Sequence, residues 1–66
     1  MKVGTYIRHF LYRIKGKAIY RYGLVVHNEP QKRIKVLWHP LLNHKKQQSS
    51  YIEIIKMEMI EIISEP

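Results

Sequence analysis

Residues 19–38, IYRYGLVVHNEPQKRIKVLW, decide the fold of this chain. Two runs rich in β-branched and aromatic residues, 19–27 and 33–38, flank a short polar stretch that contains Asn28 and Pro30. Runs of this composition predict strands, and Asn and Pro between two such runs favour a turn. The stretch therefore predicts a β-hairpin.

The alternation of side chains in the second arm of the hairpin predicts its core-facing side. Ile34, Val36 and Trp38 alternate with mostly cationic positions, so these three side chains form one apolar face. Trp38, the only tryptophan, carries the largest apolar surface in the chain and ends this arm. Trp38 is therefore either the anchor of the core or an exposed contact at the mouth of the fold, and we favour the core position.

The first arm of the hairpin leaves two interpretations open. Tyr20 and Tyr22 share a face with Leu24 and Val26, and Arg21 lies on the opposite face. If the tyrosines face the core, the same alternation exposes Arg21. If the tyrosines face the solvent, their rings are available to a ligand. Gly23 interrupts the arm and marks a bulge or a close backbone approach.

Two further segments, residues 6–15 and 51–63, fit a helix about as well as a strand. Residues 51–63, however, contain six isoleucines, whose branching at Cβ suits a sheet better than a helix. We therefore predict two strands, 50–55 and 59–63, joined by a tight turn. The alternative is an α+β fold with a helix at 6–15 or 51–63 packed on the 19–38 hairpin.

Five segments follow one another in an order that carries a family resemblance. They are VGTYI at 3–7, a basic loop from Arg8 to Ala18, YGLVV at 22–26, IKVLW at 34–38 and MIEII at 59–63. The series resembles a small five-stranded Src homology 3-like barrel. More narrowly, it is similar to short barrel proteins encoded by tailed bacteriophages, with the KOW, Tudor and Sm-like barrels as more distant relatives.

The resemblance implies an all-β fold with a single barrel domain over residues 1–66. Barrels of this kind bind RNA, DNA, peptides or neighbouring subunits and rarely catalyse reactions. A barrel this small fills its interior with side chains, so its loops and strand edges form the working surface. The resemblance also implies a virion or the host cytoplasm as the location, with a phage virion protein or a host protein as a partner.

Composition points to a polyanionic partner. The chain has 66 residues and no cysteine, which allows one small domain and excludes both disulfides and thiolate zinc sites. Twelve Lys and Arg against five Glu leave a net charge of +7. The charge is uneven, because residues 1–46 hold eleven bases and one acid, and residues 47–66 hold one base and four acids. Nucleic acid is the commonest partner of such a surface.

Basic residues fall into two groups. The first, within residues 8–22, is interspersed with tyrosines, and the second comprises residues 32–35 of the hairpin and 44–46 of the segment that follows. Cations neutralise phosphates, and aromatic rings stack on unpaired bases. We expect both groups to line one rim of the barrel and to form a single positive zone. The predicted nucleic-acid-binding residues are Arg8, Tyr12, Arg13, Lys15, Lys17, Arg21, Lys32, Arg33, Lys35, Lys45 and Lys46.

Other chemistry is not supported by the residues present. Aspartate is absent, and the hydroxyls have no identifiable base partner, so we expect no enzyme and no catalytic residue. The four histidines have no recognised ligand spacing, so we expect no metal and no cofactor. No apolar run is long enough to cross a membrane, and the start MKVGTYIRHF lacks the apolar stretch of a signal peptide. We therefore expect no integral membrane insertion and no export by that route.

These observations predict a non-enzymatic phage-type module that contacts nucleic acid or a nucleoprotein complex through basic loops, with little sequence specificity. One alternative is a virion or assembly protein, in which Leu41 and Leu42 contact another protein and the cations face an acidic protein surface. Self-association into a homo-oligomer fits the same interpretation. A further alternative is a small inhibitor of a host enzyme.

Overall fold

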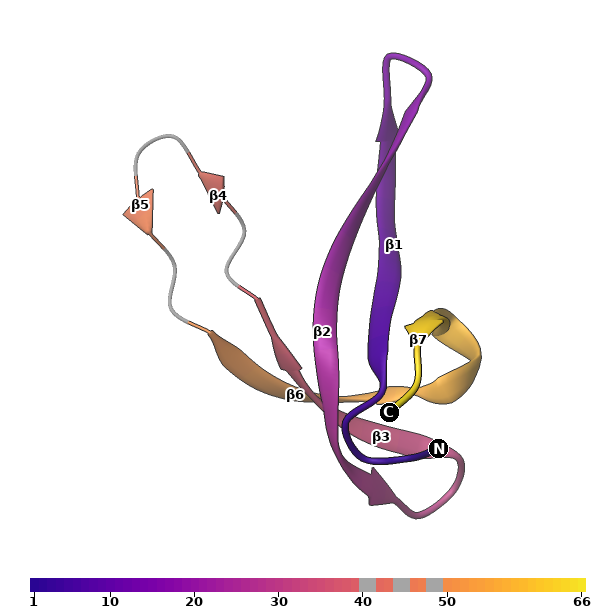
Figure 1. Cartoon of the computed structure of the whole chain (residues 1–66). Coiled ribbons are helices and arrows are strands. Elements are labelled where there is room, and N and C mark those ends of the chain that lie inside the picture. Colours follow the sequence, from indigo (N-terminus) through magenta and orange to yellow (C-terminus); the bar gives the residue numbers. More distant parts are fainter. Residues whose placement is uncertain (40–41, 44–45, 48–49) are drawn as a thin grey trace.

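The computed structural model describes residues 1–39, 42–43, 46–47 and 50–66. Five antiparallel strands form one sheet in the order β6-β3-β2-β1-β7, and β4 and β5 form a separate two-stranded ladder (Figure 1). This arrangement confirms the all-β class. The elements are β1 (Tyr6–Ile14), β2 (Lys17–Glu29), β3 (Arg33–Trp38), β4 (Leu42–Asn43), β5 (Lys46–Gln47), β6 (Tyr51–Lys56), the 3-10 helix η1 (Met57–Met59) and β7 (Ile60–Ser64).

The predicted β-hairpin is confirmed as β2 and β3. Its strands pair antiparallel around a turn in which Gln31 and Lys32 have positive φ angles of 63° and 56°. β2 begins two residues earlier than predicted, at Lys17, and so extends well beyond the end of β3. This extra length pairs with β1 instead.

The basic segment from Arg8 to Ala18 is not a loop, which corrects the expectation from the sequence. Residues 6–14 form β1, and only Lys15 and Gly16 connect it to β2. Both turn residues have positive φ angles, 48° and 79°, which matches the two-residue turns whose twist suits an antiparallel hairpin. The β1–β2 hairpin therefore projects as a two-stranded ribbon beyond the rest of the sheet (Figure 1).

The C-terminal segment forms two short strands separated by a break, as predicted. β6 and β7 lie within two residues of the predicted limits, and η1 fills the break. The helical alternatives at 6–15 and 51–63 are wrong, because both segments pair as strands. β6 and β7 are the two edges of the sheet and do not pair with each other in the described part of the chain. The described sheet is therefore open.

The core is small and centres on Trp38. Ile7, Val25, Ile34, Val36 and Trp38 are fully buried, and they come from the three central strands. The predicted core position of Trp38 and the predicted apolar face of β3 are both confirmed. Met1, Ile55, Met57 and Ile60 cover the margin of this cluster.

The core-facing side of β2 is the side that carries Arg21, Gly23 and Val25. The interpretation that buries Tyr20 and Tyr22 is therefore wrong, and Tyr22 is 39% exposed. Gly23 explains the choice of face, because a Cβ built on it would lie 2.5 Å from Cγ1 of Val36 and 2.7 Å from Cε3 of Trp38. The indole of Trp38 occupies the space that any larger residue at position 23 would need.

We predict that Gly23→Ala destabilises the fold by about 1–3 kcal/mol, because the new methyl group overpacks the core against Trp38. Urea unfolding followed by the emission of Trp38 measures both the stability and the environment of the indole. Gly16→Ala is the control, because it meets only the strain of a positive φ, with no neighbour within 4 Å. An unchanged indole spectrum in Gly23→Ala would contradict the packing described here.

Candidate nucleic-acid interface

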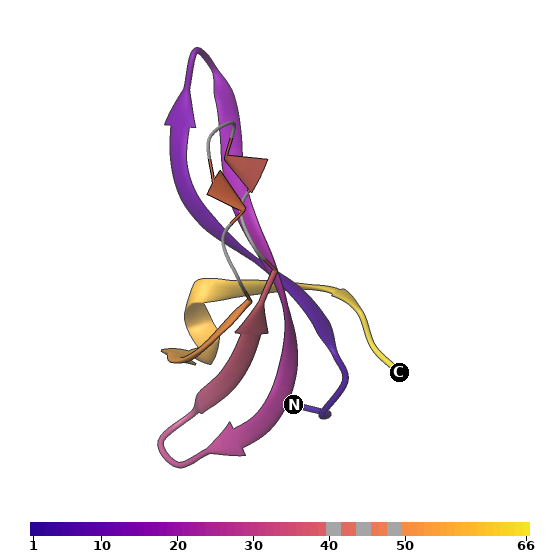
Figure 2. The same ribbon diagram turned by 90° about the vertical axis from the view of Figure 1, so that its left-hand side faces the viewer.

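The predicted basic residues occupy two separate regions of the fold. Arg13, Lys15 and Lys17 lie at the tip of the β1–β2 hairpin, whereas Lys32 and Arg33 lie at the β2–β3 turn. The 13 residues of β2 separate the two regions, and both views place them at opposite ends of the molecule (Figures 1 and 2). For these five residues the expectation that both groups line one rim is wrong, because a continuous extended strand keeps them apart.

The remaining members of the second group are spread over β3 and the segment that follows it. Lys35 is half-buried on β3, opposite Ile54 of β6. Leu41 and Lys45 lie outside the described residues, and for Leu42 in β4 and Lys46 in β5 only the backbone is described. The structure thus leaves the contribution of residues 40–49 to any interface as a prediction.

The hairpin-tip group, defined as Arg13, Lys15 and Lys17, is the densest set of exposed cations along β1 and β2. All three residues are exposed, and none of them forms an ion pair with a carboxylate of the described residues. Nη1 of Arg13 donates a hydrogen bond of 3.1 Å to the carbonyl oxygen of Gly16, which holds this side chain against the turn. The charges at the tip are therefore available to a ligand.

Arg8 lies on the solvent-facing side of β1 and is partly neutralised. Its Nη2 donates a hydrogen bond of 3.0 Å to Oε2 of Glu61 on β7. Its guanidinium carbon also lies 4.0 Å from the centre of the Tyr20 ring. The hydrogen bond from Arg8 to Glu61 raises the pKa of Arg8, and the carboxylate charge acts in the same direction. Arg8 therefore offers less free charge to phosphate than the hairpin-tip group does.

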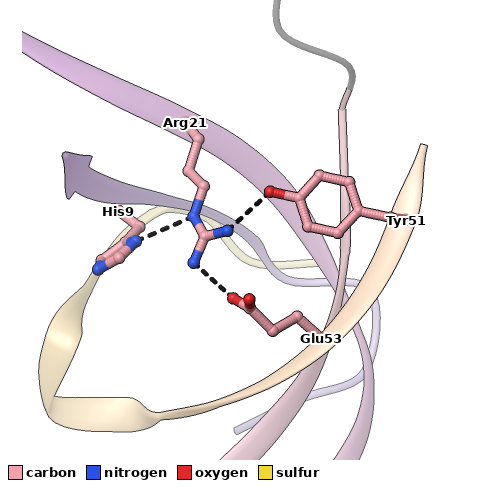
Figure 3. A network of polar contacts seen from close by, with 4 residues as sticks. All are labelled: His9, Arg21, Tyr51 and Glu53. Carbon is pink, nitrogen blue, oxygen red and sulfur yellow. Dashed lines mark hydrogen bonds and ion pairs between the residues drawn. The ribbon is translucent and has the colours of Figure 1, made fainter. Parts of the chain in front are cut away.

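Arg21 lies on the core side of the sheet and joins three strands (Figure 3). Its side chain is 11% exposed, and Nη2 lies 2.6 Å from Oε1 of Glu53 on β6. Nε donates a hydrogen bond of 3.0 Å to Nδ1 of His9 on β1, and Nη1 donates one of 2.8 Å to the hydroxyl of Tyr51 on β6. The guanidinium carbon lies 3.9 Å from the centre of the Trp38 ring. Every nitrogen of this fork is engaged within the fold, so the position of Arg21 favours a structural role.

Sequence reasoning did not assign roles to His9, Tyr51 and Glu53, the acceptors around Arg21. They come from β1 and β6, which do not pair with each other, so no local spacing links them to β2. The sequence leaves open which side of β2 faces the core, so it gave no signal for this network. Once Arg21 is placed on the core side, a carboxylate partner is expected, and Glu53 is one of only five in the chain.

The environment of His9 favours the neutral form of its ring. Burial lowers the pKa of His9, and the nearby charge of Arg21 lowers it further, while Glu53 acts in the opposite direction. Because Nδ1 accepts a hydrogen bond from Arg21, protonation of this nitrogen would remove the bond. The folded state therefore binds this proton less readily than the unfolded state does.

The described residues contain no group of three or more His or Glu side chains that could hold a metal ion. No helix in the described ranges is long and apolar enough to cross a membrane.

Comparisons with protein-family models, with curated proteins and with solved structures found no match to this chain. The site must therefore be interpreted from its own geometry.

We expect the free energy of unfolding to fall as the pH is lowered through about 6.5, the ordinary pKa of histidine. The lowered pKa of His9 in the folded state gives this sign, since the unfolded state takes up the proton first. The slope for one proton is at most about 1.4 kcal/mol per pH unit. Urea unfolding of wild type and His9→Gln at a series of pH values tests this. The control is His39→Gln, at an exposed histidine whose side chain forms no ion pair with a described carboxylate. A His9→Gln variant that keeps the same pH dependence as this control would contradict the account.

Arg21→Lys should destabilise the fold by about 1–3 kcal/mol, because an ammonium cannot reach three acceptors in the geometry of the guanidinium fork. Arg13→Lys makes the same substitution at the exposed hairpin tip and should change stability by less than about 0.5 kcal/mol. Chemical unfolding monitored by Trp38 emission compares the two. Equal stability of both variants would show that the network around Arg21 contributes little.

Proposed function

We propose that this chain is a non-enzymatic module that binds nucleic acid through the projecting β1–β2 hairpin, with little sequence specificity. The observation that carries the proposal is the hairpin-tip group: three exposed cations at the end of a two-stranded ribbon, without an ion pair to any described carboxylate. A ribbon of this kind reaches a polyanion without hindrance from the rest of the domain. The net charge of +7 supports the same partner.

Phosphate neutralisation is the physical basis of the proposed binding. Each cation that meets a phosphate releases a condensed counterion, so affinity arises without contacts to base edges and falls steeply with salt. Contacts of this type position a protein but carry no sequence information. The cations at the β2–β3 turn lie at the far end of β2 and serve as a second contact for a long nucleic acid.

We further propose that the sheet belongs to a small Src homology 3-like barrel of the phage type, located in a virion or in the cytoplasm of an infected cell. The proposal is supported by the pairing of β1 with β7, the last strand of the chain. It is also supported by the single 3-10 turn that leads directly from one edge of the sheet to the other.

The second candidate function is that of an assembly component. It is favoured by exposed isoleucines on both sheet edges: Ile52 and Ile54 on β6 are 60% and 45% exposed, and Ile62 and Ile63 on β7 are 49% and 46% exposed. Exposed apolar edge strands are a common site of protein contact. Light scattering separates the two functions by measuring the size of the protein alone, where assembly gives a larger particle, and with nucleic acid, where binding does.

We predict that reversing the tip charges in Arg13→Glu/Lys15→Glu/Lys17→Glu lowers the affinity for nucleic acid. The slope of log affinity against log salt should become shallower by about 2 to 3, since each phosphate contact contributes close to one to that slope. Titration of labelled oligonucleotides between about 50 and 200 mM salt measures the slope.

To be compared with the double reversal Arg13→Glu/Lys15→Glu at the tip, the matched control is Lys2→Glu/Lys56→Glu, which changes the net charge by the same amount at exposed positions outside both basic groups. It should keep most of the slope. If these two double variants lose binding equally, overall charge rather than the hairpin tip drives association, and the proposed site is wrong.

A further inference from the structure

The solvent-facing side of the β1–β2 hairpin carries a cluster of aromatic rings. We call it the aromatic face and define it as Tyr6, Phe10, Tyr20 and Tyr22. Phe10 lies opposite Tyr20 in the ladder, and Tyr22 lies opposite Arg8. Because side chains alternate along a strand, these positions point away from the side that carries Ile7, Arg21 and Gly23. The cluster is thus separate from the core.

Ring contacts organise the aromatic face into two pairs. The rings of Tyr6 and Tyr22 are stacked, with centroids 6.2 Å apart and an interplanar angle of 17°. Phe10 meets Tyr20 edge to face, with centroids 5.8 Å apart and an angle of 79°. Arg8 covers Tyr20. Even after these contacts, Phe10 stays 45% exposed and Tyr22 stays 39% exposed.

Stabilisation of the hairpin explains only part of this arrangement. A two-stranded ribbon has no third strand to support it, and cross-strand aromatic pairs contribute to such a ribbon. That role accounts for the contact between Phe10 and Tyr20. It does not account for the exposed areas of Phe10 and Tyr22, since the solvent side of an antiparallel sheet is ordinarily polar.

We infer that the ligand of this hairpin is single-stranded nucleic acid, whose bases stack on Phe10 and Tyr22; this inference rests on the proposed function. The two rings occupy diagonal positions of the ladder, which lie about 7–8 Å apart, so each ring can receive a different base. An unpaired strand presents base faces to such rings, whereas a duplex buries them in its own stack. Arg13, on the same side of the ribbon, then meets the phosphates.

The test compares a labelled single strand with a duplex of the same length, using wild type, Phe10→Leu and Tyr22→Leu. Wild type should bind the single strand more tightly than the duplex. Each leucine substitution should weaken single-strand binding by about tenfold or more, since stacking on one ring contributes that much. Neither substitution should change the salt slope, because the charges at the tip are untouched. A strand that contains 2-aminopurine should lose fluorescence on binding wild type but not on binding the double variant Phe10→Leu/Tyr22→Leu.

Two controls separate loss of stacking from loss of structure. Tyr12 is among the residues that the sequence predicts to contact nucleic acid, but it pairs in the ladder with Ile19 and so lies on the side of the ribbon opposite to the aromatic face. Tyr12→Leu removes this 54% exposed ring and should bind like wild type. Phe10→Tyr/Tyr22→Phe keeps both rings and should also bind like wild type. Trp38 emission reports whether each variant is folded.

Three results would overturn this inference while leaving the proposed function intact. They are equal affinity for single strand and duplex, leucine variants that bind like wild type, and unchanged 2-aminopurine fluorescence. A wild-type chain that binds neither form of nucleic acid overturns the proposed function itself. Single strands of DNA and of RNA, tested side by side, identify which of the two the aromatic face prefers.

Discussion

The contact on which the rest of the structure depends is the packing of the Arg21 guanidinium over the indole of Trp38. The core has only five fully buried apolar side chains among the described residues, and Trp38 is the largest of them. Arg21 covers its ring and bonds to partners on β1 and β6, so one side chain ties three strands together above the core. A buried guanidinium without partners is costly. Any pairing of β2 that separated Arg21 from these partners would therefore be disfavoured. The polar network around Arg21 thereby covers the core on this side of the sheet.

Because of this network, some cations and aromatic residues of the hairpin stabilise the fold and others are available to a ligand. Arg21 serves the fold, and Arg8 is held by Glu61, which leaves the hairpin-tip group as the cations that are exposed without an ion pair along β1 and β2. Because side chains alternate along β2, placing Arg21 on the core side places Tyr22 on the solvent side. The aromatic face is therefore a direct consequence of how Trp38 is packed. A ligand that follows the solvent side of the ribbon meets rings first and then the charged tip.

Much of the fold could be predicted from local patterns. The 19–38 hairpin, the two short C-terminal strands and the core position of Trp38 each rest on strong alternation or on β-branched composition. Which side of β2 faces the core could not be predicted, because tyrosine fits either side of a sheet. The side is decided at Gly23, where any larger residue would clash with residues of β3. The register shifts within β1 and β2 also break the alternation that sequence patterns assume. The separation of the two basic groups depends on how far β2 extends, which is decided by pairing with β1 rather than by any local signal.

The central claim is that the core side of the sheet is committed to the fold and the solvent side of the β1–β2 hairpin binds the ligand. Chemical-shift mapping by NMR during titration with a single-stranded oligonucleotide tests it most directly. The account predicts that backbone and ring signals of Phe10, Tyr22 and the hairpin-tip group move most, while the Nε–H signal of Arg21 stays in place. Largest changes at the Arg21 Nε–H group or along β3 and β6, with the hairpin unaffected, would contradict it.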